Sequence, residues 1–459
     1  MGFPMLLCLL LCSYCAVALG GFVVVPGSSF QPQAVCSTSR VTSEPRRASL
    51  PLAHRHGPCA ALGSRTSDKP SLAERLRMDR ARANYIISKA TGRMTTLSEG
   101  GASIPTYLGD AVDSLEYVVT LSIGTPAVQQ TVLIDTGSDL SWVQCKPCNS
   151  TQCYPQKDPL FDPAKSSSFR PIPCGTAACK QLVVDGYDNG CTNSTATGAP
   201  SLCGYAIEYG NGAITTGVYG TETLTINAGV SLSKFGFGCG SNQHGPYDRF
   251  DGLLGLGGAP ESLVSQYGVA FSYCLPPTNS SAGFLTLAPP PNNTAGFVFT
   301  PMYRYAPDIA TFYLVTLTGI SVGGKPLDIA PSVLAGGLII DSGTVITGLP
   351  KTAYAALRKA FRSAMSQYPL VPSSDTGLDT CYNFTGHSEV VVPKVALTFN
   401  GSATIELDVP SGVLVESCLA FIAEGRDGGV GIIGNVNQRT FEVLYDSRQG
   451  TVGFRAGAC

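Results

Sequence analysis

The sequence has little charge and little histidine. Only 14% of its 459 residues are Asp, Glu, Lys or Arg, against 44% hydrophobic residues, which excludes an intrinsically disordered chain. Glycine and proline are frequent but follow no triplet period, so a collagen-like helix is excluded as well. At about 100–200 residues per domain, the length predicts two or three domains with a large core.

Long hydrophobic runs are lacking except at the N-terminus. Met5–Leu19 has about the length of the apolar region of a secretory signal peptide, and Ala18 and Gly20 supply small residues for cleavage. We therefore expect a signal peptide at residues 1–20. Because no Lys or Arg precedes the apolar run, a signal anchor is the alternative. No later stretch reaches the roughly 18 apolar residues of a membrane span, so we expect no membrane contact after signal removal.

Cysteine, in contrast, is abundant. Twelve of the 17 cysteines form an even set from residue 145 onward, which predicts up to six disulfides in an oxidising compartment and leaves their connectivity open. They are Cys145, Cys148, Cys153, Cys174, Cys179, Cys191, Cys203, Cys239, Cys274, Cys381, Cys418 and Cys459. The same region holds six N-glycosylation sequons, as in a secreted glycoprotein. They lie at Asn149, Asn193, Asn279, Asn292, Asn383 and Asn400.

The close spacing of Cys145, Cys148 and Cys153 could also indicate zinc. Structural zinc usually has four protein ligands, often including His. From Cys145 onward the chain has only His244 and His387. We therefore expect disulfides here, no metal and no cofactor.

Charge is divided unevenly along the chain. Residues 1–112 hold 12 Lys and Arg against 6 Asp and Glu, a net of +6, whereas residues 113–459 hold 18 against 26, a net of −8. This division favours a removable basic pro-segment at residues 21–112 that neutralises an acidic body. We expect its processing site between residues 93 and 115.

A helix is predicted within this basic stretch. Ser71 and Glu74 have the spacing of a capping box, and apolar residues follow at helical intervals. The apolar stripe consists of Leu72, Leu76, Ala83, Ile86 and Ile87. The alternative to a pro-segment helix is a solvated basic helix.

The remainder of the chain has the pattern of a β protein. Short β-branched and aromatic runs alternate with Gly, Pro, Asn and Asp, and a helical pattern is clear only at Lys351–Tyr368. Examples of the strand-like runs are Tyr117–Ile123, Thr131–Ile134, Gly217–Ile226, Phe312–Val322 and Thr440–Phe454.

A repeated pair of motifs suggests two homologous lobes. Asp135-Thr-Gly-Ser138 and Asp341-Ser-Gly-Thr344 each follow an apolar strand. Gly252-Leu-Leu-Gly255 follows the first, and Gly431-Ile-Ile-Gly434 follows the second. The longer spacing in the first lobe predicts an insertion, for which the region Cys145–Cys203 is suited.

The two aspartates have the setting of a catalytic pair. An Asp at the end of a hydrophobic strand would be buried, which raises the cost of ionising it. Two such carboxylates face to face would share one proton. The pair could then act as base and acid together, as the attack of water on an amide requires.

On these motifs the chain resembles the pepsin-like aspartic proteases, and among them the plant nepenthesin-like group, over residues 113–459. The shared proton is a known property of that family. The resemblance rests on Asp135-Thr-Gly-Ser-Asp-Leu-Ser-Trp142, Asp341-Ser-Gly-Thr344, Phe250-Asp-Gly-Leu-Leu-Gly-Leu-Gly257, Ile432-Ile-Gly-Asn435, the Cys145–Cys153 pattern and Phe271-Ser-Tyr-Cys-Leu275. It implies a mostly β, bilobal double-β-barrel fold, rich in disulfides, with lobes at 113–300 and 301–459 and the active site between them.

The resemblance also implies residue roles. The ionised member of Asp135 and Asp341 would take a proton from a bound water, while the protonated member would donate to the oxyanion. Tyr209 would cover the substrate and hold the closed flap with Trp142 and Ser138. Substrate contacts or carboxylate orientation would come from Gly210, Asn211, Gly137, Gly343 and Thr344, and bracing of the two turns from Thr136 and Ser342.

Some residues depart from the family pattern. The second turn has Ser342 where many relatives have Thr, which is a mild change. The flap has Asn211 and Ala213 where Thr or Asp and Ser are more usual, so its specificity is open. There is no saposin-like insert of the kind found in typical vacuolar plant enzymes.

Rival functions have weaker support. Gly319-Ile-Ser-Val-Gly323 fits a serine-nucleophile motif, but the Ser continues a β-branched run rather than starting a helix. A non-catalytic binding protein, like the xylanase-inhibitor relatives on this fold, is the main alternative, although both Asp residues and Tyr209 are present. Nucleoid DNA binding is another, but a mature region of net −8 should repel phosphate.

We therefore expect a secreted aspartic endopeptidase, active at acidic pH and made as a zymogen. Its partners would be protein or peptide substrates and its own pro-segment as an intramolecular inhibitor, with no nucleic acid. We expect a monomer in the apoplast, with vacuole and plastid as the less favoured locations.

Overall fold

The computed structural model describes residues 20–30, 35–36, 48–62, 70–91, 115–192, 201–209, 213–245, 249–278, 280–289, 294–303, 310–372 and 376–459. Several predictions fall outside these ranges. They are the signal peptide up to residue 19, most of the expected processing interval, the flap residues Gly210 and Asn211, and the sequons at Asn193, Asn279 and Asn292. Among the described sequons, Asn149, Asn383 and Asn400 are all exposed.

The described elements are mainly short strands. The helices are α1 (Leu72–Ala90), α2 (Ala177–Val184), α3 (Leu263–Tyr267) and α4 (Lys351–Ala364), and the 3-10 turns are η1 (Gly27–Phe30), η2 (Pro163–Lys165), η3 (Pro331–Val333), η4 (Asn400–Ser402) and η5 (Asn435–Gln438). The first strands are β1 (Phe22–Pro26), β2 (Ala48–His54), β3 (Tyr117–Ile123), β4 (Val128–Asp135), β5 (Trp142–Gln144), β6 (Arg170–Pro171), β7 (Asp188–Thr192), β8 (Leu202–Glu208), β9 (Ile214–Asn227), β10 (Val230–His244), β11 (Gly252–Gly255), β12 (Ala270–Cys274), β13 (Ala282–Leu287), β14 (Val298–Tyr303) and β15 (Leu314–Val315). The others are β16 (Leu317–Val322), β17 (Lys325–Pro326), β18 (Leu338–Ile340), β19 (Thr347–Leu349), β20 (Leu370–Val371), β21 (Cys381–Tyr382), β22 (Glu389–Pro393), β23 (Val395–Phe399), β24 (Thr404–Glu406), β25 (Leu414–Val415), β26 (Cys418–Leu419), β27 (Phe421–Ala423), β28 (Gly431–Ile433), β29 (Glu442–Asp446) and β30 (Thr451–Arg455).

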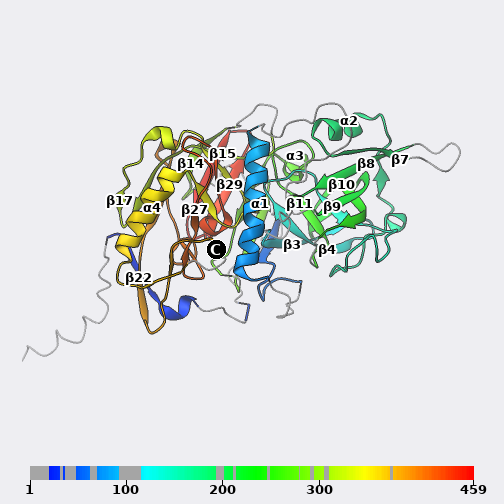
Figure 1. Cartoon of the computed structure of the whole chain (residues 1–459). Coiled ribbons are helices and arrows are strands. Elements are labelled where there is room, and N and C mark those ends of the chain that lie inside the picture. The colour runs from blue at the N-terminus through cyan, green and yellow to red at the C-terminus, as the bar shows by residue number, and fades with distance from the viewer. Residues whose placement is uncertain are drawn as a thin grey trace, which may run out of the picture.

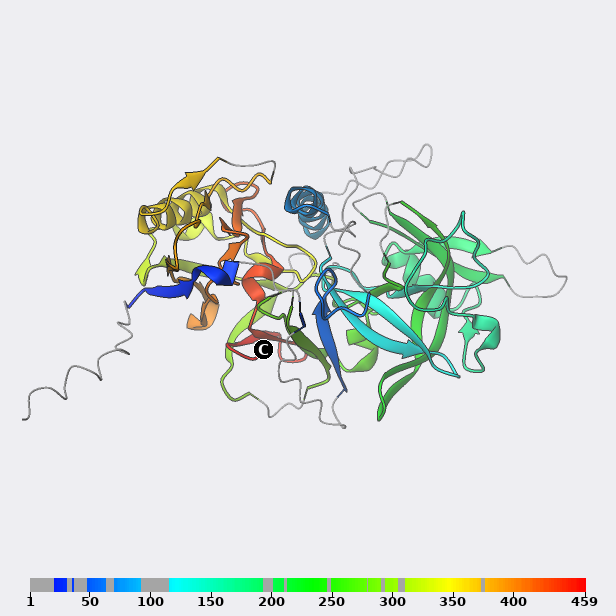
Figure 2. The same cartoon turned by 90° about the horizontal axis from the view of Figure 1, so that it is seen from below.

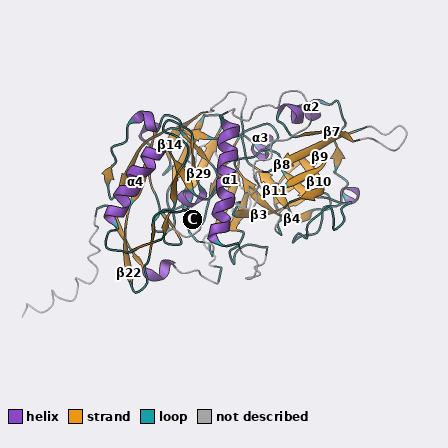
Figure 3. Cartoon of the chain, in the orientation of Figure 1, coloured by secondary structure: helices purple, strands orange, loops and turns teal. Residues whose placement is uncertain are grey.

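These strands form two lobes, and α1 lies between them (Figures 1 and 3). In Figure 1, β3, β4 and β8 to β11 lie on one side of α1, and α4 with β22 and β27 lies on the other. Figure 2 views α1 almost along its axis and shows the same separation. The prediction of a mostly β, bilobal fold is confirmed, while the lobe boundaries at 113 and 301 stay predictions.

The repeated motifs form equivalent strand pairs in the two lobes. In the first lobe β4 runs parallel to β11, and Asp135 is in register with Gly255. In the second, β18 runs parallel to β28, with Ile340 beside Ile433. Each aspartate therefore lies at the end of a strand that pairs with a Gly-hydrophobic-hydrophobic-Gly strand, as the motif order predicts.

Glycine is required where these strands pass close to other backbone. A Cβ added at Gly255 would lie 2.0 Å from the carbonyl oxygen of Asp139, and one at Gly434 would lie 2.5 Å from that of Val345. No side chain fits at such distances, so the second glycine of each motif lets a strand pass directly beside the turn that carries an aspartate.

One sheet joins the lobes and includes part of the predicted pro-segment. β12 pairs with β29 of the C-terminal half, and β13 pairs with both β12 and β2. β2 in turn pairs with β3, so residues 48–54 lie inside this sheet. β1 pairs with β22 at another edge. The segment before residue 91 thus contributes two strands and a helix to the fold.

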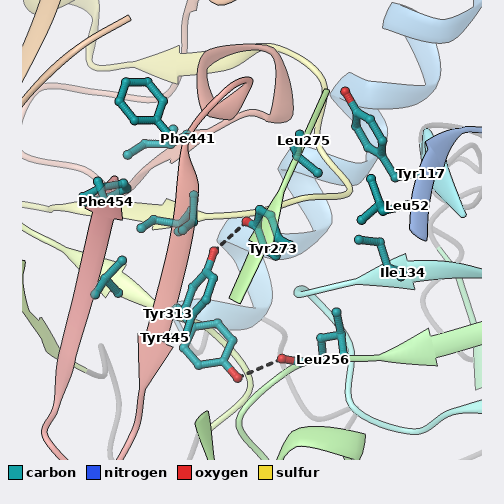
Figure 4. Packing of buried hydrophobic residues seen from close by; sticks show 14 of the residues in the cluster. Leu52, Tyr117, Ile134, Leu256, Tyr273, Leu275, Tyr313, Phe441, Tyr445 and Phe454 are labelled. Atoms are coloured by element: carbon teal, nitrogen blue, oxygen red, sulfur yellow. Dashed lines mark hydrogen bonds between the residues drawn. The ribbon is translucent and has the colours of Figure 1, made fainter. Parts of the chain in front are cut away.

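Buried aromatic residues fill the region where the lobes meet (Figure 4). The rings of Phe271 and Tyr445 stack with centroids 4.5 Å apart, and the Tyr445 hydroxyl lies 2.7 Å from that of Tyr273. The Tyr313 hydroxyl donates to the carbonyl oxygen of Leu256, at 2.8 Å. Because these hydroxyls have partners, the rings can be buried without leaving a polar group unsatisfied.

All twelve cysteines from residue 145 onward are paired, as an even set predicts. The bonds are Cys145–Cys239, Cys148–Cys153, Cys174–Cys191, Cys179–Cys203, Cys274–Cys459 and Cys381–Cys418. A seventh bond, Cys36–Cys59, lies in the predicted pro-segment. The zinc alternative is wrong because its three cysteines are in disulfides.

No helix in the described ranges has the length and apolar character to cross a membrane.

Some predicted elements differ in extent. The strand at Tyr117–Ile123 has the predicted bounds, whereas the helix predicted at Lys351–Tyr368 ends at Ala364. The run Thr440–Phe454 is a hairpin, β29 and β30, with Gly450 at a φ of 62° in its turn. Gly319-Ile-Ser-Val-Gly323 lies largely on β16 and not at a strand-to-helix turn, so it lacks the geometry of a serine nucleophile.

Candidate active site

The two aspartate turns meet at the lobe interface. Asp135 is the last residue of β4 and Asp341 directly follows β18, and the two residues are 1% and 0% exposed. The two turns are joined by reciprocal hydrogen bonds. The Ser342 backbone N–H donates to the Thr136 hydroxyl at 2.9 Å, and the Thr136 N–H donates to the Ser342 hydroxyl at 3.2 Å. The structure thus brings together both aspartates and the two residues expected to brace them.

Each carboxylate is oriented by its own turn in the same way. The Ser138 hydroxyl donates to Asp135 Oδ2 at 2.6 Å, and the Thr344 hydroxyl donates to Asp341 Oδ2, also at 2.6 Å. Ser138, which the resemblance assigns to the closed flap, therefore contacts Asp135 here.

Backbone groups complete this orientation. The Gly137 N–H donates to Asp135 Oδ1 at 2.8 Å, and the Gly343 N–H donates to Asp341 Oδ1 at 3.3 Å. From its own turn, each aspartate accepts one hydroxyl and one amide hydrogen bond, so the two turns present their carboxylates in near-equivalent geometry.

The described part of the flap lies close to the first turn. Tyr209 follows β8, and its backbone N–H donates to the carbonyl oxygen of Ala213 at 2.9 Å, which closes the base of a hairpin. The Trp142 indole N–H donates to the Tyr209 hydroxyl at 2.6 Å, and both side chains are buried. Trp142 and Tyr209 are therefore in contact, as the resemblance implies.

A cation from α1 occupies the space between the two carboxylates. Arg82 Nη2 donates to Asp135 Oδ1 at 2.5 Å and to Asp341 Oδ1 at 3.0 Å. Arg82 Nε donates to Asp341 Oδ2 at 2.9 Å. Burial by itself lowers the pKa of the guanidinium, but Asp135 and Asp341 raise it overall. Burial raises the pKa of Asp341, but Arg82, together with the hydrogen bonds from Thr344 and Gly343, lowers it overall.

Comparison with known proteins places this geometry in a family. The models "Xylanase inhibitor N-terminal" and "Xylanase inhibitor C-terminal" match residues 117–287 and 312–456. An aspartyl protease family protein of Arabidopsis thaliana is 38% identical over 92% of this chain and 90% of its own length. Aspartic proteinase nepenthesin-1 of Nepenthes gracilis is 37% identical over 81% of this chain and 84% of its own. The chain belongs to the plant pepsin-like aspartic proteases.

Solved structures show the same fold in proteins with other names. Basic 7S globulin from soybean matches with a TM-score of 0.57 and 20% identity, over 74% of this chain and 90% of its own. Conglutin gamma from lupine seeds matches with a TM-score of 0.57 and 20% identity, over 74% and 91%. At this identity the likeness concerns the fold alone.

In this aspartic protease chain, α1 is attached to the second aspartate turn by more than Arg82. The Asp79 carboxylate accepts the backbone N–H groups of Val345 at 2.5 Å and Ile346 at 3.0 Å. Burial raises the pKa of Asp79 to about 7 even though these hydrogen bonds oppose the shift. Leu76 packs in the apolar cluster that contains Val345 and Ile346.

The C-terminal half of α1 packs on a second apolar cluster. Ala83 and Ile86 lie there with Phe312, Ile339 and Ile432, of which Ile339 is on the strand that leads to Asp341. The predicted apolar stripe is therefore buried both before Arg82, at Leu76, and after it, at Ala83 and Ile86. The alternative of a solvated helix is wrong because this face lies against the lobes.

A second buried charge cluster connects α1 to β2 and to the start of β3. Arg75 Nη1 donates to Glu116 Oε1 at 2.5 Å, and His54 Nε2 lies 3.5 Å from Glu116 Oε2. Burial raises the pKa of Glu116, but His54 and Arg75 more than offset this and lower it. Burial lowers the pKa of His54.

Sequence reasoning missed the individual residues of these clusters. The charge division indicated that cations of the N-terminal segment face an acidic body, but not that Arg82 in particular contacts the aspartates. A partial signal was present, since Arg82 precedes Ile86 by four residues, about one helical turn, which places it next to the apolar stripe.

Proposed function

We propose that this chain is the precursor of a secreted aspartic endopeptidase, inhibited by its own residues 21–112 until they are removed. One observation carries the proposal: two buried, equivalently oriented aspartates face one position, which Arg82 of α1 fills. The names of its relatives support peptide bonds as the substrate.

The geometry suggests how the reaction would proceed. Once Arg82 has left, two carboxylates close together cannot both ionise readily, so they would share one proton. A water held between them would lose a proton to the ionised member as it attacks the scissile carbonyl. The protonated member would donate to the developing oxyanion, and no covalent intermediate would form.

The residues around the pair would serve this exchange. Hydrogen bonds from Ser138 and Thr344 hold one oxygen of each carboxylate, which leaves Oδ1 of each turned toward the guanidinium position. Tyr209, supported by Trp142, would cover the substrate from the flap. Gly210 and Asn211 would contact the peptide backbone at the flap tip.

Several parts of the proposal come from the sequence. They are the signal peptide at 1–20, secretion to the apoplast, glycosylation at the exposed sequons and a monomeric state. The alternative of a binding or inhibitory protein draws support from the names of the two matching family models. The aspartate pair in its oriented geometry favours catalysis over that alternative.

The test is proteolysis by the processed protein. We expect the wild type to cleave a denatured protein substrate at acidic pH and to be inhibited by pepstatin. Asp135→Asn and Asp341→Asn should each lower the activity by a factor of at least about 10³. The exposed Asp188→Asn protein serves as the matched control and should retain full activity. Full activity in either dyad variant, or no pepstatin-sensitive cleavage by the wild type, would contradict the proposal.

A further inference from the structure

Lys89 of α1 lies in a polar and aromatic pocket of its own, two turns beyond Arg82. Its ammonium is 5.7 Å from the centroid of the Tyr187 ring and 5.9 Å from that of Phe312. A cation within about 6 Å of a ring face is attracted by the ring quadrupole. Tyr187 belongs to the first lobe and Phe312 to the second, so both lobes contribute to this position.

Carboxylates also act electrostatically on the same ammonium. Burial lowers the pKa of Lys89, but Tyr85, Asp139 and Asp135, together with Asp185, raise it overall. Asp139 is 1% exposed; its carboxylate accepts hydrogen bonds from the Thr311 hydroxyl at 2.6 Å and the Tyr187 hydroxyl at 3.2 Å.

A further carboxyl group, that of Glu261, lies close to Asp185. Glu261 is buried, and its pKa is raised to about 8 by burial and by the neighbouring Asp185. Its Oε2 has no hydrogen-bond partner among the described residues. A carboxyl group with that pKa is protonated at acidic pH, so Glu261 adds no negative charge there. The pocket therefore offers a cation two ring faces and the carboxylates of Asp139 and Asp185.

Most of this pocket belongs to the processed protein. Asp139 directly follows the first aspartate turn, and Glu261 precedes α3. Asp185 and Tyr187 come from the Cys-rich insertion, which the bonds Cys174–Cys191 and Cys179–Cys203 fix to the lobe. Only Lys89 and Tyr85 would leave with the pro-segment, so removal of α1 would leave the pocket without its cation.

The pocket has a defined place relative to the aspartates. Seven residues separate Lys89 from Arg82, or about 10 Å along a helix that rises roughly 1.5 Å per residue. An extended peptide advances about 3.3 Å per residue, so the same distance corresponds to about three residues of a substrate strand. α1 runs along the boundary between the lobes, where such a strand would lie (Figures 1 and 2).

We propose that Asp139, Asp185, Tyr187 and Phe312 form a subsite for a Lys or Arg side chain of the substrate, about three residues from the scissile bond. In the precursor Lys89 fills this subsite. The inference rests on the proposed peptidase function and adds a substrate preference to it.

Paired peptides test the subsite. The two peptides of a pair are identical except that one has Lys and the other Gln at a single position. Different pairs place this position at different distances from the scissile bond, on either side of it. We expect kcat/KM to be about 10-fold higher for Lys at one position about three residues away, with Arg behaving similarly. Assays are run at the least acidic pH at which the processed enzyme cleaves the Gln peptides, because burial raises the pKa of Asp139 and acid would neutralise it.

Variants separate this pocket from general charge effects. Asp185→Asn and Tyr187→Leu should each reduce the Lys-to-Gln ratio to near one. Asp188→Asn makes the same charge change three residues away on an exposed strand and should leave the ratio intact. A ratio near one at every position in the wild type, or an equal loss in Asp188→Asn, would overturn the subsite.

The two proposals fail in different ways. Pepstatin-sensitive cleavage of the Gln peptides reports the peptidase alone. If no peptide is cleaved, the pocket is tested in the precursor by the thermal midpoints of Lys89→Met, Asp185→Asn and the double variant. A pocket that binds Lys89 predicts that both single variants lower the midpoint and that the double variant lowers it no further than Lys89→Met. Additive losses would overturn the pocket without bearing on the aspartates.

Discussion

At the scale of single residues, Arg82 makes the two aspartates compatible in one buried position. Two carboxylates that face each other repel, and one of them must bind a proton to relieve this. A guanidinium presents several donors in a planar fork, and here it contacts both carboxylates at once. Arg82 lowers the pKa of Asp341 in the docked state, whereas the proposed mechanism requires one of the two aspartates to be protonated. Under the proposed mechanism, Arg82 would therefore keep the pair from catalysing while α1 is docked.

Asp79 lies one helical turn before Arg82. Its pKa is raised by docking, whereas that of Asp341 is lowered, so its effect on stability has the opposite pH dependence to that of Asp341. Its pKa is about 7 with α1 docked, against an ordinary value of 3.8, so docking is favoured when Asp79 is protonated. The stability that Asp79 contributes is therefore largest below about pH 4 and falls as the pH rises through 7. Asn resembles the protonated form at every pH. We expect Asp79→Asn to raise the free energy of unfolding of the precursor at pH 7 by on the order of a few kcal/mol, and its thermal midpoint with it. Near pH 4 both should change little.

The measurement is calorimetry of the intact precursor at both pH values. Asp188→Asn is the control, because that carboxylate is exposed and distant from α1 in sequence. An Asp79→Asn midpoint that is lower than the wild-type midpoint at pH 7 would show that the two N–H contacts outweigh burial.

At the scale of elements, α1 begins at a capping box that was predicted from the sequence. The Ser71 hydroxyl accepts the Glu74 backbone N–H at 3.2 Å, and the Glu74 carboxylate accepts the Ser71 N–H at 2.7 Å. Removing such a cap costs about 1 kcal/mol, or roughly a fivefold change in an opening equilibrium. We expect Ser71→Ala to speed hydrogen exchange of the α1 amides in the precursor by about that factor, whereas Ser71→Thr, which keeps the hydroxyl, should not. Equal exchange in all three proteins would mean that packing alone fixes the helix start.

The same elements show what the sequence could and could not predict. The capping box, the strand at Tyr117–Ile123 and the paired aspartate motifs depend on local pattern or on a repeat, and they were predictable. The contact of Arg82 was not, because α1 carries five cations and its docking decides which one reaches the aspartates. The disulfide pairs were equally out of reach, since they join segments up to 185 residues apart.

At the scale of the whole molecule, the segment before residue 91 contacts both lobes and the sheet between them. β1 pairs with β22, β2 lies between β13 and β3, and α1 lies between the lobes. These attachments are independent of the chain connection between residues 91 and 115. A cut in that connection should therefore not release the segment by itself.

This arrangement predicts a stable, inactive complex after cleavage. A recognition sequence for a specific protease inserted between residues 91 and 115 would allow the chain to be cut at pH 7. We expect the two fragments to co-elute in size-exclusion chromatography and to show no proteolysis at that pH. Acidification should separate them once the contributions of Asp341 and Glu116, whose pKa values are lowered in the docked state, are lost and this loss exceeds the gain from protonated Asp79.

Arg82→Met in the same cut protein tests the cause. Without the guanidinium, the fragments should separate at a higher pH than in the wild type, because the buried aspartates then lack their counter-charge. The exposed Arg77→Met on the same helix is the matched control and should behave like the wild type. Separate elution of the wild-type fragments at pH 7 would show that β1, β2 and α1 need the covalent connection to stay in place, and that the precursor is held closed by chain continuity rather than by the contacts of Arg82.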